Sequence, residues 1–247
     1  MRWRVWLDRL VVLLVLLALW QVGSMVLGNY WLSTPWSTVT RFFAALFNGE
    51  LVFHGGYTIS EALAGCVIGG VPAVLLPFLL RRQPVIVAIL DPFMVGGYGA
   101  PKLAFAPLFI LWFGIGELPK VLLVALGVSF PLYLNTFSAI RQVDPKLFET
   151  AEVLGFSFWQ RFHRIIVPSA APQVLVGARQ SLAIAWLTLI VAEQINADKG
   201  IGFLIMNARD FLRIDIIIFG LIVYALLGIG TDAIVRAFER RALRYRS

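Results

Sequence analysis

Charged residues are scarce in this sequence. They make up 14% of its 247 residues, whereas 60% of the residues are apolar and the mean hydropathy is +0.84. Soluble domains carry about 25% charged residues, so this composition excludes an ordinary soluble domain and predicts an integral membrane protein. No segment alternates apolar and polar residues over the length of a barrel strand, so we expect helices as the spanning elements.

Cysteine and histidine are nearly absent. Cys66 is the only cysteine, which excludes a disulfide or a cysteine-based metal site within one chain. His54 and His163 lie far apart in the sequence, so a histidine-bound metal is not expected. The phosphate-binding motif G-x-x-x-x-G-K-[ST] is missing, and no nucleophile, base and orienting group occur at a readable spacing. We therefore expect neither ATP binding nor enzymatic activity in this chain.

Long apolar runs dominate the rest of the sequence. Several approach or exceed the roughly 17 to 25 residues that cross a hydrocarbon core of about 30 Å. Six spans are predicted, over residues 10–27, 57–80, 103–113, 120–139, 175–195 and 215–237. The first run could instead be a secretory signal peptide, but bulky Trp20 and Met25 stand where a small-residue cleavage site belongs, and further spans follow it.

In this topology most of the basic residues lie on one side of the membrane. The net charge of +7 would suit nucleic acid only if Lys and Arg gathered on one exposed face, and here they flank apolar runs. Five of the 21 fall in predicted outer segments, namely Arg41, Lys120, Lys199, Arg209 and Arg213. The other 16 lie at or near the inner face, which predicts that both termini are cytoplasmic.

The connector after the first span has two interpretations. Thr34 and Pro35 fit an N-cap and a first helical position, and apolar residues then recur on one face as far as Phe47. This pattern favours a short helix lying in the outer membrane interface. The alternative is an ordinary packed helix of the same bundle.

The region from Pro84 to Lys102 is apolar but contains Asp91 and a glycine-rich run at 96–99. A straight span would place Asp91 in lipid at a cost of about 2.5 to 3.5 kcal/mol, and it would reverse the sidedness of the second half. We therefore predict an elbow helix over 84–95, a glycine-rich break and then a short span, with one long broken span as the alternative. Such a break must be packed in protein or line a wet cavity.

The longest polar interruption of the second half covers residues 144–168 and is called the polar loop below. Asp144 and Pro145 fit an N-cap and a first helical residue, and Gly155 can end that helix in the left-handed conformation. Ser157 can cap a second helix, which Pro168 is expected to stop. This pattern predicts two short helices that meet at a glycine and form a rigid, exposed element. The alternative is a plain amphipathic connector resting on the membrane.

The polar loop also carries a family signature. Glu149-Thr150-Ala151, Gly155, Ile165 and Val167-Pro168 resemble the signature loop of permease subunits of bacterial ATP-binding-cassette importers. That signature reads Glu-Ala-Ala, three residues, Gly, nine residues and Ile-x-Leu-Pro, from which Thr150 and Val167 depart conservatively. Segments 109–114, 185–193, 200–209 and 224–228 resemble the nitrate, taurine, aliphatic-sulfonate and bicarbonate branch of these permeases.

The resemblance implies an all-α, polytopic membrane protein with the type I importer fold of methionine and molybdate permeases. It implies an N-terminal part, residues 1–56, and a permease core, residues 57–247, that contains the polar loop as a pair of cytoplasmic coupling helices. The implied partners are a second permease copy, two ATPase subunits that bind ATP and Mg themselves, and a periplasmic or lipid-anchored solute-binding protein. The location would be the bacterial inner membrane, and no nucleic-acid partner is expected.

The solute is expected to be a small anion of the sulfonate, taurine, nitrate or bicarbonate type, and the sequence does not select among these. The resemblance assigns coupling to the ATPase to eight residues of the polar loop: Glu149, Ala151, Gly155, Phe158, Trp159, Phe162, Ile165 and Pro168. Gly155 would set the elbow between the helices. The three aromatic residues would fill a groove of the ATPase.

Six residues are candidates for the translocation pathway: Tyr98, Lys102, Arg179, Trp186, Thr188 and Glu193. Packing or interface anchoring is an equal alternative for Tyr98 and Trp186. An inner-face anchor is the alternative for Arg179, and a gating or helix-tying role is expected for Glu193. A secondary transporter or channel without ATPase partners would explain the spans but leaves the polar loop unexplained.

Overall fold

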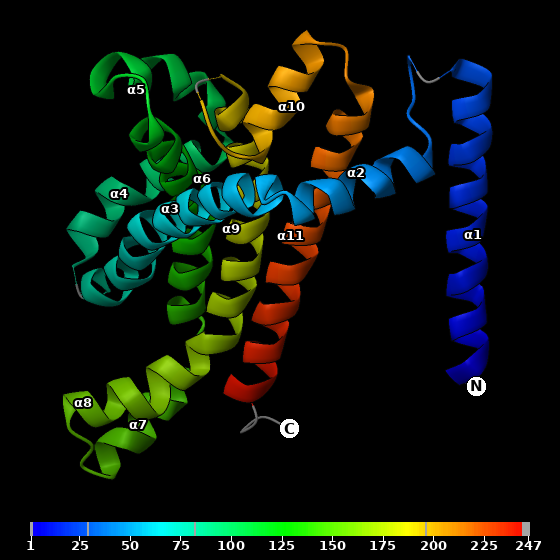
Figure 1. Ribbon diagram of the computed structural model, residues 1–247. Coiled ribbons are helices and arrows are strands. Elements are labelled where there is room, and N and C mark those ends of the chain that lie inside the picture. The colour runs from blue at the N-terminus through cyan, green and yellow to red at the C-terminus, as the bar shows by residue number, and fades with distance from the viewer. Residues whose placement is uncertain (1, 29, 82, 196, 244–247) are drawn as a thin grey trace. The chain divides into compact units, whose positions relative to one another are not determined.

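The computed structural model describes residues 2–28, 30–81, 83–195 and 197–243, and every regular element within these ranges is helical (Figure 1). The helices are α1 (Arg2–Leu27), α2 (Pro35–Phe47), α3 (Glu50–Leu80), α4 (Pro84–Gly99), η1 (Lys102–Phe105), α5 (Ala106–Phe113), α6 (Glu117–Arg141), α7 (Pro145–Val153), α8 (Phe158–Arg161), η2 (Phe162–Ile166), α9 (Val167–Ile195), α10 (Ile201–Asp210) and α11 (Ile214–Ala242). The predicted all-α class is confirmed. Arg82 and the basic tail after Leu243 lie outside the described residues.

Five of these helices are long and apolar enough to cross a membrane, and the count is six if α4 and the segment Lys102–Phe113 form one broken span. The prediction of about six spans is therefore confirmed. The chain divides into two compact units, Met1–Thr58 with Asp198–Ala225, and Ile59–Ala197 with Leu226–Ser247. The division into residues 1–56 and 57–247 stays a prediction.

In the first unit, helix ends are capped as the sequence suggests. The Thr34 side chain accepts a hydrogen bond from the Ser37 N–H, with Pro35 in the first turn of α2. One face of α2 packs through Phe42 against Phe219 of α11, with 6.0 Å between ring centroids, while Trp36 stays exposed. The helix is thus both packed and amphipathic.

The N-terminus of α10 is capped by side chains from α3. The Gly200 N–H donates to His54 Nδ1 at 3.1 Å, and the Ile201 N–H donates to Thr58 Oγ1 at 2.9 Å. The first N–H groups of a helix have no partner within the helix, so these two contacts satisfy groups that would otherwise be orphaned. They fasten α10 to the start of α3.

In the second unit, α6 is the central helix, and glycines let its neighbours approach. A Cβ at Gly65 of α3 would lie 2.5 Å from Val124, and a Cβ at Gly69 would overlap the backbone of Ala125. The Gly65-x-x-x-Gly69 pattern therefore marks a close helix contact. On the other side of α6, the Ser181 hydroxyl of α9 donates to the Val128 carbonyl at 3.0 Å.

Helix α4 differs from the prediction. It continues through the glycine-rich run to Gly99 and ends at Ala100, whose ψ of 146° is extended. Ala100 precedes Pro101, and a proline disfavours the helical conformation of the residue before it. The predicted glycine break is wrong because Pro101 sets the boundary, while Gly97 stays helical and packs against Phe130. The segments on either side of the break are bent by 100°.

The predicted stop at Pro168 is also wrong. Residues Phe158–Ile195 form one continuous helical run of 38 residues, because the π-helical turn η2 precedes the proline. In this turn the Val167 N–H donates to the Phe162 carbonyl. A wider turn absorbs the missing N–H and the ring of a proline without ending a helix.

Candidate functional site

The elbow of the polar loop is built from local hydrogen bonds. Asp144 Oδ1 accepts from the Lys146 N–H at 2.9 Å and starts α7. At the other end, the Phe156 N–H donates to the Ala151 carbonyl at 2.8 Å and the Gly155 N–H donates to the Glu152 carbonyl at 3.0 Å. This pair of bonds is a Schellman motif. It places Gly155 at φ +67°, a conformation that favours glycine.

The second helix starts on a capping box. The Ser157 hydroxyl accepts from the Gln160 N–H, and Gln160 Oε1 accepts from the Ser157 N–H at 2.8 Å. Arg161 Nε then donates to the Phe156 carbonyl at 2.9 Å. These bonds fix the four residues between the helices, so the angle at the elbow is specified by the loop itself.

A small core holds the two helices together. Val143, Ala151 and Ile165 form a buried cluster, against which Phe148 and Phe156 pack. Ala151 is 1% exposed and Ile165 is 9% exposed. The predicted residues Ala151, Gly155 and Ile165 therefore act within the loop, as its core and elbow, and Pro168 lies where the loop enters α9.

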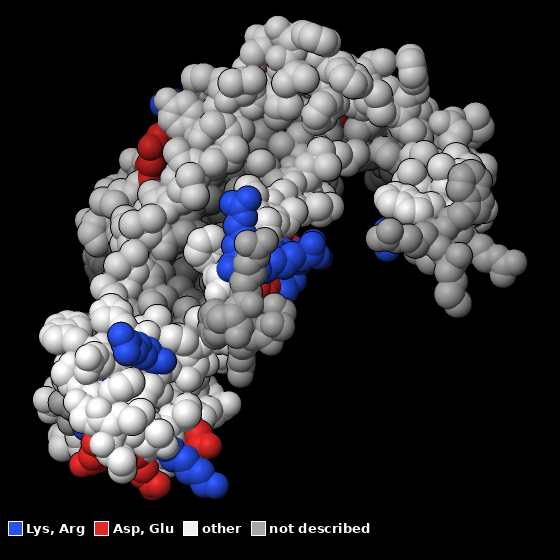
Figure 2. Space-filling view, turned by 90° about the horizontal axis from the view of Figure 1, so that it is seen from below, with Lys and Arg blue, Asp and Glu red and all other residues white. Residues whose placement is uncertain are grey.

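The exposed tip of the loop is more extensive than the sequence suggested. Trp159 is 65% exposed, as expected of a groove-filling residue, but Phe162 turns back onto Phe78 of α3, with 5.6 Å between the rings. Val153 and Leu154, which the sequence reasoning missed, are 89% and 63% exposed. Seen from below, the end that carries α7 and α8 is mostly uncharged, with charged side chains at its border (Figure 2).

The signal for Val153 and Leu154 was present in the sequence. They are apolar residues directly before the glycine that ends α7, where Phe148 and Ala151 already supply the buried face.

The two remaining predicted coupling residues have different surroundings. Phe158 lies beneath the Arg81 guanidinium, which is 5.9 Å from the centroid of its ring. Glu149 is exposed and makes no hydrogen bond or ion pair with any described residue, so its carboxylate is open to a partner.

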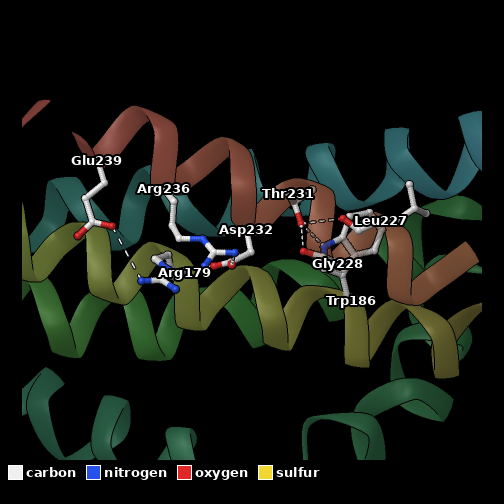
Figure 3. A network of polar contacts seen from close by, with 8 residues as sticks. All are labelled: Arg179, Trp186, Leu227, Gly228, Thr231, Asp232, Arg236 and Glu239. Atoms are coloured by element: carbon white, nitrogen blue, oxygen red, sulfur yellow. Dashed lines mark hydrogen bonds and ion pairs between the residues drawn. The ribbon is translucent and has the colours of Figure 1, made fainter. Parts of the chain in front are cut away.

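Two of the predicted pathway residues face α11 (Figure 3). Arg179 Nε lies 3.0 Å from Asp232 Oδ1, and its Nη1 lies 3.9 Å from Glu239 Oε2. Asp232 is shared with Arg236, at 2.6 Å. Trp186, two turns further along α9, donates from Nε1 to Thr231 Oγ1 at 3.0 Å. Both residues tie α9 to α11.

Thr188 and Glu193 are buried, at 5% and 1% exposure. Thr188 lies against α6, where a Cβ at Gly127 would be 3.1 Å from its hydroxyl. Glu61 is 2% exposed and its carboxylate lies 2.5 Å from Lys120 Nζ, because α3 and α6 pack closely together here.

Tyr98 and Lys102 lie together at the break between α4 and η1. The Lys102 ammonium donates to the Tyr98 carbonyl and lies over two rings, 5.2 Å from the centroid of Tyr98 and 5.7 Å from that of Phe130. The six predicted pathway residues thus have different neighbours. Tyr98 and Lys102 line the break, Arg179 and Trp186 meet α11, Thr188 meets α6, and Glu193 is buried near the end of α9.

Comparison with known proteins gives consistent results. A family model described as "binding-protein-dependent transport system inner membrane component" matches residues 62–244. A Bacillus subtilis (strain 168) protein named as the aliphatic sulfonates transport permease SsuC is 41% identical over 244 residues, which cover 98% of this chain and 88% of that protein. The taurine transport system permease protein TauC of Escherichia coli (strain K12) is 34% identical over 183 residues, 74% of this chain and 66% of that protein.

Among solved structures, inward-facing conformations of the MetNI methionine ABC transporter have a similar fold. The TM-score is 0.55 at 17% identity, and the match covers 76% of this chain and 93% of that one.

Proposed function

Because the chain belongs to the family of binding-protein-dependent transport system inner membrane components, we propose that it forms a solute pathway with a second permease copy and receives force from ATPase subunits through the polar loop. The chain itself is a multi-pass permease subunit of an ATP-binding-cassette importer. A secondary transporter or channel, the alternative raised by the sequence, is set aside by this family membership.

The observation that carries the proposal is the construction of the polar loop. Its helices are locked to each other by the Schellman motif, the capping box and a buried core. Its outer surface nevertheless presents Val153, Leu154 and Trp159 to solvent. Exposed apolar residues on a rigid element are typical of a protein interface. ATP and Mg would bind to the partner ATPase and not to this chain.

Orientation follows from the same interface. The polar loop must face the cytoplasm to meet an ATPase, and the Lys and Arg asymmetry supports this sidedness. Both termini then lie in the cytoplasm. A solute-binding protein would deliver the solute on the opposite side of the membrane.

The proposed solute is an aliphatic sulfonate. The support is the name of the relative with 41% identity, together with the taurine permease at 34%, because taurine is itself an aminoalkyl sulfonate. Uptake of a labelled alkanesulfonate by cells that express the complete system, compared with labelled nitrate, tests this assignment. Uptake of nitrate and not of the sulfonate would contradict it.

Co-purification tests the role of the loop. The wild-type complex is isolated from native membranes and its ATPase content is compared with that of Leu154→Glu. Burying a carboxylate in an apolar interface is costly, so the variant should lose most of its ATPase. Phe211→Glu is the matched control, since Phe211 is 73% exposed but lies outside the loop. Equal ATPase recovery in the wild type and Leu154→Glu would refute the assignment.

A further inference from the structure

A cavity of about 580 Å³ lies beside α4, α6 and the end of α3. Its walls are formed by Arg81, Pro84, Val87, Ala88, Asp91, Phe137, Ile140 and Arg141. The four α4 positions are spaced i, i+3, i+4 and i+7, and the three α6 positions are spaced i, i+3 and i+4, so each helix gives one face to the cavity. None of these residues was predicted to form a site.

Three of the lining residues are charged. Asp91 makes no hydrogen bond or ion pair with any described residue, and Arg141 contacts the Phe137 ring, at 5.4 Å from its centroid, but no described carboxylate. Ionisable groups within membrane helices are costly and are usually paired or functional. The carboxylate and the guanidinium line the same cavity without neutralising each other, so both are available to a ligand.

The charges are separated along the cavity. Arg81 directly follows the last residue of α3, shortly before Pro84 starts α4, and Arg141 is the last residue of α6. Asp91 lies two turns along α4 from Pro84, about 10 Å at 1.5 Å per residue. One end of the cavity is therefore cationic and a carboxylate stands further in. A simple anion would meet repulsion from Asp91, whereas a molecule with both an oxyanion and an ammonium group satisfies both ends.

We propose that this cavity binds an aminoalkyl oxyanion, with its phosphate or sulfonate at Arg141 and its ammonium facing Asp91. Two molecules at this membrane carry that chemistry. One is a phospholipid with an ethanolamine phosphate headgroup, and the other is a free aminoalkanesulfonate such as taurine. Only the second source rests on the proposed function. Arg81 also lies over Phe158 of the polar loop, so the occupant would lie next to a residue that supports the loop.

The test uses the full-length chain in lipid nanodiscs. In one arm, phosphatidylethanolamine is titrated into phosphatidylglycerol discs and the retained lipid is counted by native mass spectrometry. In the other arm, labelled taurine is bound in discs without ethanolamine lipid. Ethanesulfonate, which lacks the ammonium, and ethanolamine, which lacks the oxyanion, serve as competitors. Both should compete less well than the complete zwitterion.

Arg141→Gln should weaken binding by about tenfold or more, as expected for a hydrogen bond to a charged group. Asp91→Asn should weaken zwitterion binding but not ethanesulfonate binding, a difference that a general loss of folding would not produce. Arg240→Gln is the control, since Arg240 is exposed on α11 and does not line the cavity.

If only the lipid is retained, the occupant of the cavity is a phospholipid headgroup. If only taurine binds, the occupant is the free aminoalkanesulfonate. Binding of neither probe to the wild type, or equal loss in Arg240→Gln and Arg141→Gln, would overturn the proposal. No ATPase is needed in these measurements, so a failure of the coupling assignment would leave their result intact.

Discussion

The elbow at Gly155 allows a quantitative test of the coupling proposal. Its φ of +67° lies in the left-handed region, where other residues cost roughly 1 to 2 kcal/mol. A Cβ at this position would meet no atom within 4 Å. The penalty for Gly155→Ala is therefore purely conformational, and steric overlap does not contribute.

If the ATPase binds the elbow in this geometry, the penalty appears as weaker docking. A cost of roughly 1 to 2 kcal/mol corresponds to an affinity about fivefold to thirtyfold lower. Gly155→Asn should lose less affinity for the ATPase than Gly155→Ala, since asparagine tolerates the left-handed conformation. Gly155→Val should lose more affinity than Gly155→Ala, because valine is β-branched. The assay titrates purified ATPase onto the permease in nanodiscs and measures binding and solute-stimulated ATP hydrolysis.

Gly114 provides the matched control. Like Gly155, it has a positive φ, 79°, and a Cβ at this position would meet no atom within 4 Å. Unlike Gly155, it follows α5 and lies outside the polar loop. Gly114→Ala should cost a similar amount of stability and leave ATPase docking unchanged. The reasoning would be refuted if Gly155→Ala and Gly155→Val bound the ATPase as tightly as the wild type does. It would also be refuted if Gly114→Ala lost as much affinity for the ATPase as Gly155→Ala.

Three further predictions concern the membrane helices and are checked by thermal unfolding in nanodiscs. Gly69→Ala should destabilise by about 1 to 3 kcal/mol, since its Cβ would overlap the Ala125 backbone, whereas Gly70→Ala, with its nearest atom at 3.4 Å, should be tolerated. Lys120→Met should lower the free energy of unfolding by about 3 to 5 kcal/mol, because it leaves the Glu61 carboxylate buried and unpaired. The double variant, Lys120→Met with Glu61→Leu, should recover most of this loss. Asp232→Asn should cost less than about 1 kcal/mol because its ion pairs are partly exposed.

Local signals made the polar loop predictable. Asp144, Gly155 and Ser157 are an N-cap, a left-handed residue and a capping-box serine, and each acts through neighbours within a few positions in the sequence. Interactions of this range are specified by residue type and spacing alone. The same holds for Thr34 at the start of α2.

The helix boundaries around proline were harder to predict, because proline has two possible effects. Pro101 ended a helix through the residue before it, while Pro168 was absorbed by a π-helical turn. Which effect occurs depends on what the neighbouring turns can accommodate. The Lys120–Glu61 pair could not be predicted either, since the two residues are 59 positions apart and meet only through the packing of α3 on α6.

Continuity between the polar loop and α9 determines how force could travel. The expected stop at Pro168 would have placed a flexible joint between the second loop helix and the span. Instead the run Phe158–Ile195 is unbroken, and the turn at η2 keeps backbone hydrogen bonds through it. A movement of the exposed tip at Trp159 would therefore act on α9 directly. Helix α9 is in turn tied to α11 by Arg179 and Trp186. Under the proposed function, these two residues are then better placed to transmit movement between spans than to bind the solute.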